Sequence, residues 1–135
     1  MSATANKAVL RRLTEQVNKR NLAVVDEVFS STFVLHDANQ SHWPRGLEGA
    51  RRMFTVMLTA VPDLQLTMED CIAEGDKVVV RWTFRGTHTG PSVTGGAPTG
   101  EPVTALAIGI YRLVAGKIEE DWGMVARCVT RTPWE

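Results

Sequence analysis

The sequence has little that would support a disulfide-bonded, membrane-bound or nucleic-acid-binding protein. Among its 135 residues are only two cysteines, Cys71 and Cys128, in strand-like segments without CxxC spacing, which favours buried thiols over a disulfide or a metal site. No apolar run approaches the roughly 18 residues of a membrane helix, and the amino terminus becomes amphipathic at once. Fifteen Lys and Arg balance fifteen Asp and Glu, so no basic surface is expected. We therefore expect a cytoplasmic protein with no nucleic-acid partner and no membrane partner.

Common catalytic and cofactor-binding motifs are also missing. The sequence has no Gly-x-Ser-x-Gly nucleophile turn, no phosphate-binding glycine loop and no dinucleotide-binding fingerprint. The pair Gly95-Gly96 lies between two expected strands, with no helix amino terminus behind it to bind phosphate. None of the three histidines has a metal-binding spacing with another. Any reaction should therefore be acid–base chemistry that uses no cofactor and no metal.

What is present is the composition of one globular domain. Apolar residues make up 44% of the chain and charged residues 22%, which is ordinary for a folded protein. A chain of this size exposes about 7,000 Å² when folded and roughly 21,600 Å² when unfolded. The surface that becomes buried on folding is enough to form one core. No internal repeat or linker divides the sequence. Residues 1–135 are therefore expected to form a single domain.

The first half of the chain has the apolar spacing of helices. Residues 6–21 and 22–29 each carry one apolar stripe at intervals of three and four residues. A short apolar run at 33–36 predicts a strand. The widest apolar face lies within 47–61 and predicts a third helix, which Pro62 stops.

After Pro62 the apolar period changes to 2, which predicts strands. The expected strands cover 64–73, 77–85, 103–113 and 117–129. A loop rich in glycine and proline separates the second of them from the third. Because no helix lies between these strands, we expect an α+β fold with a curved antiparallel sheet packed on three N-terminal helices. Such a sheet forms a cone, and a pocket inside it would be lined by alternate strand residues.

The last expected strand carries a carboxylate on a largely apolar face. Strict alternation places on that face Ile118, Glu120, Trp122, Met124 and Ala126. Burial there would raise the pKa of Glu120, which suits a general acid or base. The alternative is an edge carboxylate paired with Arg81 or Arg112. Asp121 lies on the opposite face and is expected to be solvated.

In strand 77–85, Arg81 alternates with two aromatic residues, Trp82 and Phe84. The aromatic set belongs either to the core or to a dimer face. An inward Arg81 could pair with a carboxylate or polarise a substrate carbonyl, and a solvated arginine is the alternative.

The three histidines are candidates for proton transfer because their reference pKa is near 6.5. His36 next to Asp37 could form an oriented acid–base pair, or it could be a loop histidine that only binds backbone. His88 lies where a strand enters the glycine-rich loop, a natural pocket mouth, although a turn histidine without chemistry is equally compatible. His42 is expected to lie on a loop surface.

Short motifs in a fixed order carry a resemblance to a known family. They include Phe33-Val34-Leu35-His36-Asp37, Gly46-Leu47-Glu48-Gly49, Val61-Pro62-Asp63-Leu64, Gly75-Asp76-Lys77-Val78, Gly86-Thr87-His88-Thr89-Gly90, Pro98-Thr99-Gly100 and Trp122-Gly123. In this order they resemble the SnoaL-like polyketide cyclases and ester cyclases of the nuclear transport factor 2-like superfamily, over nearly the whole chain. The resemblance is specific for the fold and much less so for the reaction.

The resemblance implies a cone of three helices and a curved sheet that encloses an apolar pocket, in a homodimer or larger assembly formed through the outer sheet face. Relatives close polyketide rings by aldol condensation, isomerise ketosteroids, open epoxides, hydroxylate anthracyclines without a cofactor, or only bind. Matched to this sequence, the catalytic candidates are His88, His36, Asp37, Glu120 and Arg81. The substrate-binding candidates are Trp43, Trp122, Met124, Phe54 and Met57.

One departure from the family pattern bears on the reaction. Many relatives have an acid–base Asp four residues after the Trp of the last strand, where this chain has Ala126. Glu120 lies about 20 Å away along an extended strand, so it does not simply replace that Asp. His88, or His36 with Asp37, could supply the base instead.

The leading prediction is a cyclase or isomerase that acts on a small hydrophobic carbonyl compound. A non-catalytic binding or scaffold domain is the rival, because Ala126 cannot transfer a proton. Cofactor-free hydroxylation or epoxide opening is a third possibility. It would require Asp37 and Glu120 to converge on a water molecule.

Overall fold

The computed structural model describes residues 2–36, 42–92 and 95–128, with side chains in the last strand described as far as Gly123. The elements are α1 (Ala3–Asn18), α2 (Val24–Val28), β1 (Phe29–Leu35), α3 (Gly46–Ala60), β2 (Gln65–Glu74), β3 (Lys77–Thr87), β4 (Pro102–Val114) and β5 (Lys117–Cys128). The predicted three helices, the strand between them and the four later strands are confirmed. The fold class is α+β, as predicted.

The five strands form one sheet in the order β1-β5-β4-β3-β2. The pairs β2–β3, β3–β4 and β4–β5 are antiparallel, whereas β1 runs parallel to β5. The prediction of a wholly antiparallel sheet is therefore wrong at this edge. A short turn forces antiparallel pairing only between strands that it joins directly. Because α3 and three strands separate β1 from β5 in the chain, no such turn fixes their relative direction.

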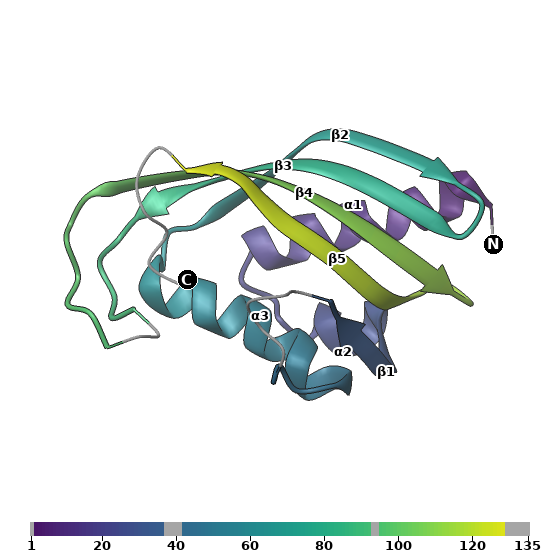
Figure 1. Cartoon of the computed structure of the whole chain (residues 1–135), viewed down its shortest axis with the longest axis horizontal. Coiled ribbons are helices and arrows are strands. Elements are labelled where there is room, and N and C mark those ends of the chain that lie inside the picture. The colour runs from purple at the N-terminus through teal and green to yellow at the C-terminus, as the bar shows by residue number, and fades with distance from the viewer. Residues whose placement is uncertain (1, 37–41, 93–94, 129–135) are drawn as a thin grey trace.

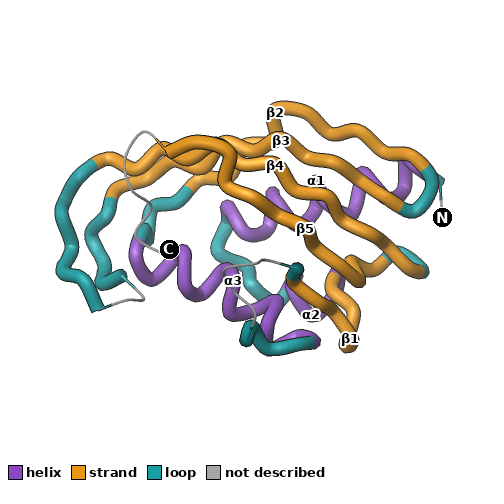
Figure 2. Tube along the Cα trace, in the orientation of Figure 1, coloured by secondary structure: helices purple, strands orange, loops and turns teal. Residues whose placement is uncertain are grey.

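The helices lie on one face of the curved sheet. Figure 1 shows the strands arched over α1 and α3, and Figure 2 shows the three helices on the same side. The core lies between these layers, where Phe29 meets Phe33 and Phe54 edge-on at ring-centroid distances of 4.9 and 6.1 Å. Each such ring contributes about 1.5–3 kcal/mol through burial of apolar surface. The opposite face of the sheet carries no helix among the described residues.

The last strand contains an extra residue that changes which side chains face inward. The register of β4 with β5 runs Val114↔Lys117, Leu113↔Ile118, Arg112↔Glu120 and Tyr111↔Asp121. Glu119 therefore forms a bulge, so the inner face of the strand passes from Ile118 to Asp121 instead of to Glu120. Ile118 is fully buried and Asp121 is only 6% exposed, whereas Trp122 is 36% exposed. The predictions that Glu120 shares a face with Ile118 and that Asp121 is solvated are both wrong for this reason.

Candidate active site

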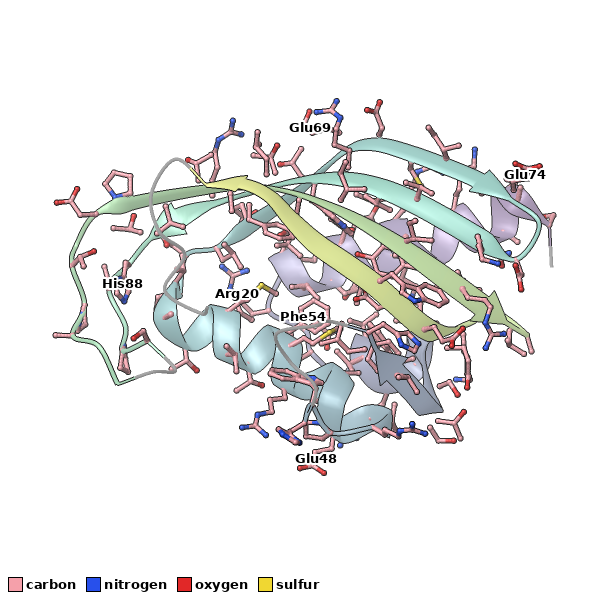
Figure 3. The ribbon with its side chains drawn as sticks, viewed as in Figure 1. Arg20, Glu48, Phe54, Glu69, Glu74 and His88 are labelled. Carbon is pink, nitrogen blue, oxygen red and sulfur yellow. The ribbon has the colours of Figure 1, made fainter. Side chains whose placement is uncertain are left out.

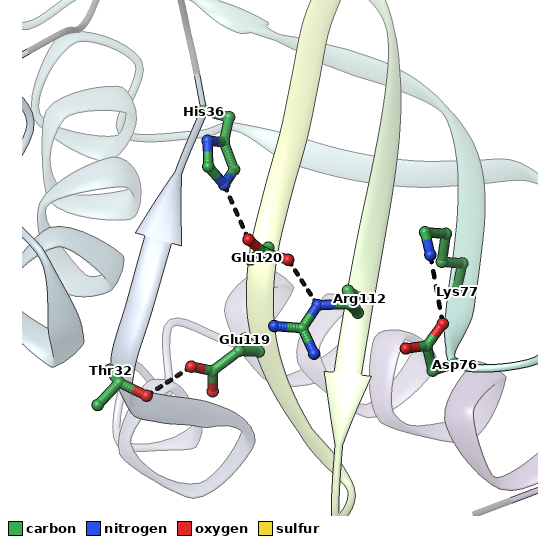
Figure 4. A network of polar contacts seen from close by, with 7 residues as sticks. All are labelled: Thr32, His36, Asp76, Lys77, Arg112, Glu119 and Glu120. Atoms are coloured by element: carbon green, nitrogen blue, oxygen red, sulfur yellow. Dashed lines mark hydrogen bonds and ion pairs between the residues drawn. The ribbon is translucent and has the colours of Figure 1, made fainter.

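Glu120 lies on the outer face of the sheet in a surface ion-pair group. Its Oε1 lies 3.1 Å from His36 Nε2, and its Oε2 accepts a hydrogen bond of 2.5 Å from Arg112 Nε (Figure 4). The Arg112 bond, and then the His36 bond, lowers the pKa of Glu120. The expected raised pKa is therefore wrong, and the alternative of a carboxylate paired with Arg112 is correct.

Two further candidates share this outer surface. The His36 ring stacks on Trp122 at a centroid distance of 4.9 Å and an interplanar angle of 8°. Arg81 is about half exposed, and its Nε donates to Asp70 Oδ2 at 2.7 Å. Arg81 is therefore a solvated arginine, the second of the two predicted alternatives, and does not face inward. Asp37, the proposed partner of His36, lies outside the described residues.

Beneath the sheet, three polar side chains are buried together. The Trp82 Nε1–H donates to the Tyr111 hydroxyl at 2.9 Å, and Asp121 lies opposite Tyr111 on the neighbouring strand. Burial raises the pKa of Tyr111 well above its ordinary value of 10.0, and the negative charge of Asp121 adds to this effect. Trp82 therefore belongs to the core, one of the two alternatives predicted for it. Sequence reasoning missed Asp121 because the bulge at Glu119 leaves no signal in the apolar alternation.

His88 lies at the other end of the molecule, one residue beyond β3 (Figure 3). The residue is only 6% exposed. Its Nδ1 lies 3.2 Å from the Thr99 hydroxyl oxygen and 3.4 Å from the Thr99 backbone nitrogen. Its Nε2 is buried, and no hydrogen-bond partner for it occurs within the described residues. This nitrogen is a buried polar atom whose capacity for a hydrogen bond is unused.

The backbone around His88 is held by contacts to the end of α3 and the segment after it. Asp63 accepts hydrogen bonds from the Thr87 backbone N–H at 2.7 Å and from the Thr87 hydroxyl at 3.0 Å. The backbone bond from Thr87 is the main reason why the pKa of Asp63 is lowered. Gly90 donates to the Ala60 carbonyl at 3.0 Å. These bonds fix the chain on both sides of His88.

The substrate-binding candidates do not form one group. Phe54 is a buried core residue on α3, and Met57 is half-buried against that core. Trp43 donates from Nε1 to the Gly49 carbonyl at 2.9 Å, and the Arg52 guanidinium lies 5.3 Å from the centre of its ring. Trp43 is therefore held against the first turns of α3.

Ala126, where the resemblance led us to expect an Asp, lies at a second register shift in β5. Leu106 pairs with Arg127 and Ala107 with Val125, so Ala126 is the extra residue. The side chains of Met124 and Ala126 lie outside the described part of β5.

The catalytic candidates and the buried Asp121 are therefore spread over separate places. His88 follows the pair Thr87↔Pro102, whereas Asp121 pairs with Tyr111. At 3.3 Å per residue, Pro102 and Tyr111 are about 30 Å apart along β4. His88 and Asp121 cannot act on one bond of a small molecule, and His36 and Glu120 lie on the opposite face of the sheet from Asp121.

Across residues 2–36, 42–92 and 95–128, no group of three or more His, Cys, Asp and Glu side chains is placed to hold a metal ion. No helix in the described chain is both long and apolar enough to cross a bilayer.

Comparison with known proteins identifies the family. The profile of the family described as SnoaL-like polyketide cyclase matches residues 7–129. The chain belongs to the SnoaL-like polyketide cyclase family. No curated protein matches the sequence.

Several solved structures share the fold of this chain. AclR from Streptomyces galilaeus, with a suggested hydroxylase activity, is 28% identical with a TM-score of 0.78, over 92% of this chain and 80% of its own. IdmH from Streptomyces antibioticus, a suggested polyketide cyclase, is 27% identical with a TM-score of 0.75, over 90% of this chain and 91% of its own. A suggested SnoaL-like cyclase from Jannaschia sp. CCS1 is 26% identical with a TM-score of 0.80, covering 92% of this chain and 87% of its own.

Proposed function

We propose that this SnoaL-like protein is a cofactor-independent cyclase or isomerase that acts by acid–base chemistry on a hydrophobic polyketide-derived or cyclic carbonyl compound. The observation that carries the proposal is the buried His88 imidazole, whose Nε2 meets no partner in the described chain. Buried polar groups in proteins are nearly always hydrogen-bonded. A substrate oxygen at this nitrogen would complete its hydrogen bonding.

The chemistry of ring closure fits such a group. In an intramolecular aldol addition a base removes the proton beside one carbonyl, and a new carbon–carbon bond forms at another. Negative charge develops first on the enolate oxygen and then on the new alkoxide. A fixed polar group in a site that excludes water stabilises such charge without having to reorganise. His88 meets this requirement because the Asp63–Thr87 and Gly90–Ala60 bonds hold its backbone.

The test is turnover of an anthracycline-type methyl ester by the wild type, His88→Gln and His42→Gln. His42 is an exposed residue and serves as the matched histidine control. Loss of a group that exchanges a proton or stabilises an oxyanion lowers the rate by about 10² to 10⁴. We expect such a loss in His88→Gln and none in His42→Gln. Wild-type rates in His88→Gln would remove His88 from the mechanism.

Ala126→Asp, assayed in parallel, tests the rival hypothesis that the protein is a non-catalytic binding or scaffold domain. Ala126 stands where the resemblance implies that many relatives have an acid–base Asp, so a chain that had lost the reaction would regain it in this variant. Turnover by the variant alone would contradict the proposal and favour a non-catalytic binding domain that returns its ligand unchanged.

A hydroxylase is the second candidate, because AclR, with that suggested activity, is 28% identical to this chain. Mass spectrometry of the same reaction separates the two functions. Ring closure by aldol addition keeps the elemental composition of the substrate, whereas hydroxylation adds one oxygen atom.

A further inference from the structure

Thr99 directs two hydrogen-bond donors at one nitrogen of His88. Its backbone N–H donates to His88 Nδ1 at 3.4 Å, and its hydroxyl oxygen lies 3.2 Å from the same atom. That hydroxyl already accepts a hydrogen bond from the Glu101 backbone N–H at 3.2 Å. Its own hydrogen is therefore available to His88. A backbone N–H can only donate, so Nδ1 must be the acceptor.

We propose that Thr99 fixes His88 as the tautomer protonated on Nε2, so that His88 offers an N–H donor to a ligand oxygen and does not serve as the base. In neutral imidazole one ring nitrogen carries the hydrogen and the other accepts. With Nδ1 occupied as an acceptor, the hydrogen is on Nε2, the buried atom that lacks a partner in the described chain. The assignment of the tautomer stands on these contacts alone, and its catalytic consequence rests on the proposed function.

The contact between Thr99 and His88 lies within a hydrogen-bonded piece of backbone. The His88 N–H donates to the Glu101 carbonyl at 3.0 Å, and the Gly100 N–H donates to the His88 carbonyl at 2.9 Å. These bonds extend the ladder of β3 and β4 beyond the pair Thr87↔Pro102. Residue 88 and residues 99–101 are thus held in one arrangement, which keeps the donors of Thr99 aimed at the imidazole.

The tautomer defines the chemical class of the ligand atom. An Nε2–H meets an acceptor: a carbonyl, enolate or alkoxide oxygen. It does not match an ammonium group, which can only donate hydrogen bonds. In ring closure His88 would hold its hydrogen and stabilise the charge on the oxygen by a hydrogen bond, so no proton leaves the imidazole. The base that removes the substrate proton is then a different group.

The tautomer can be measured without turnover. Long-range proton–nitrogen NMR of ¹⁵N-labelled protein near neutral pH distinguishes a protonated ring nitrogen from an unprotonated one, and His88→Gln assigns the signals. We expect His88 to show hydrogen on Nε2 and a hydrogen-bonded lone pair on Nδ1. A hydrogen on Nδ1 overturns the inference, even if the enzyme turns over its substrate. The expected spectrum without any turnover supports the tautomer while the proposed function fails.

Two variants of Thr99 test its part as a positioning residue. Thr99→Ser keeps both donors and should retain the wild-type His88 spectrum. Thr99→Val removes the hydroxyl, so the Nδ1 signal should move towards that of the exposed His42. Loss of one neutral hydrogen bond should lower kcat by roughly three- to tenfold, with no further loss when combined with His88→Gln. An unchanged Nδ1 signal in Thr99→Val, or an additional loss in the double variant, would contradict the role of Thr99.

Discussion

Tyr111 on β4 lies directly across the strand ladder from Asp121 on β5, and both side chains are buried on the inner face of the sheet. Tyr111 is also the only tyrosine of the chain. Its ionisation can therefore be followed by absorbance without interference from another phenol. This makes Tyr111 a probe of the charge that Asp121 places beneath the sheet.

We expect the Tyr111 phenol to stay protonated well above its ordinary pKa of 10.0 in the native protein. Asp121→Asn should lower this pKa because it removes the neighbouring negative charge. Glu120→Gln should leave it unchanged, since Glu120 lies on the outer face beside Arg112. The measurement is an absorbance titration with circular dichroism recorded in parallel. An equal effect of the two variants would contradict the inner position of Asp121.

The same group makes stability depend on alkaline pH. The folded state keeps the phenolic proton that the unfolded chain loses above pH 10.0. The unfolded state then binds fewer protons, so the free energy of unfolding falls as the pH rises from 10.0 towards the pKa of folded Tyr111. Tyr111→Phe should weaken this fall between those two values.

The elements of the fold could be predicted from local patterns. The period of three to four residues before Pro62 and the period of two after it reflect helices and strands that each bury one face. Local patterns could not predict that β1 runs parallel to β5, because this pairing joins segments far apart in the chain.

The side-chain arrangement of the site was much less predictable. A single bulged residue, Glu119, reverses the faces that strict alternation assigns to Glu120, Asp121 and Trp122. Alternation alone therefore exchanged the positions of Glu120 and Asp121. His88 was found because glycines mark its loop, whereas its contact with Thr99 depends on how that loop returns to β4.

Gly90 is expected to be necessary for the position of His88. A Cβ at residue 90 would lie 1.8 Å from the Thr59 carbonyl oxygen, a backbone atom that cannot move aside by rotation. Gly90→Ala should therefore lower the free energy of unfolding by about 1–3 kcal/mol and reduce turnover. Gly96→Ala is the control, since its Cβ would meet only the Ser92 side chain. Equal denaturant midpoints for the two variants would contradict this account.

Asp63 should make the loop that carries His88 sensitive to acid. Its pKa lies below the ordinary 3.8, mainly because the Thr87 backbone N–H donates to it. The stabilisation is complete above pH 3.8 and is lost as the pH falls below 3.8 through the pKa of the folded state. Urea unfolding at a series of pH values should therefore show wild type and Asp63→Asn converging in acid.

Thr87→Val separates the two donors to Asp63. It removes the hydroxyl bond and leaves the backbone N–H, which is the larger cause of the lowered pKa. Most of the acid dependence should persist in this variant. Complete loss of the acid dependence in Thr87→Val would show that the hydroxyl, and not the backbone, holds the carboxylate.

The outer face of the sheet carries an apolar row suited to a second copy of the chain. Residues paired across four neighbouring strands form this row: Ile72, Val79, Ile110 and Trp122. Ile72 is 64% exposed and Ile110 38%. The homodimer implied by the family resemblance is thus a proposal for this face. Trp82 and Phe84, which suggested a dimer face from the sequence, lie on the other side, where Trp82 is buried.

Ile110 is central to the row, so we expect Ile110→Lys to convert a dimer into a monomer. A charge buried without a partner opposes association strongly, and a two-fold interface would contain the substitution twice. Thr55→Lys places the same charge on an exposed position of α3 and should leave the dimer intact. Sedimentation equilibrium measures both. A wild-type monomer at all concentrations, or a dimer that persists in Ile110→Lys, would exclude this face as the contact between subunits.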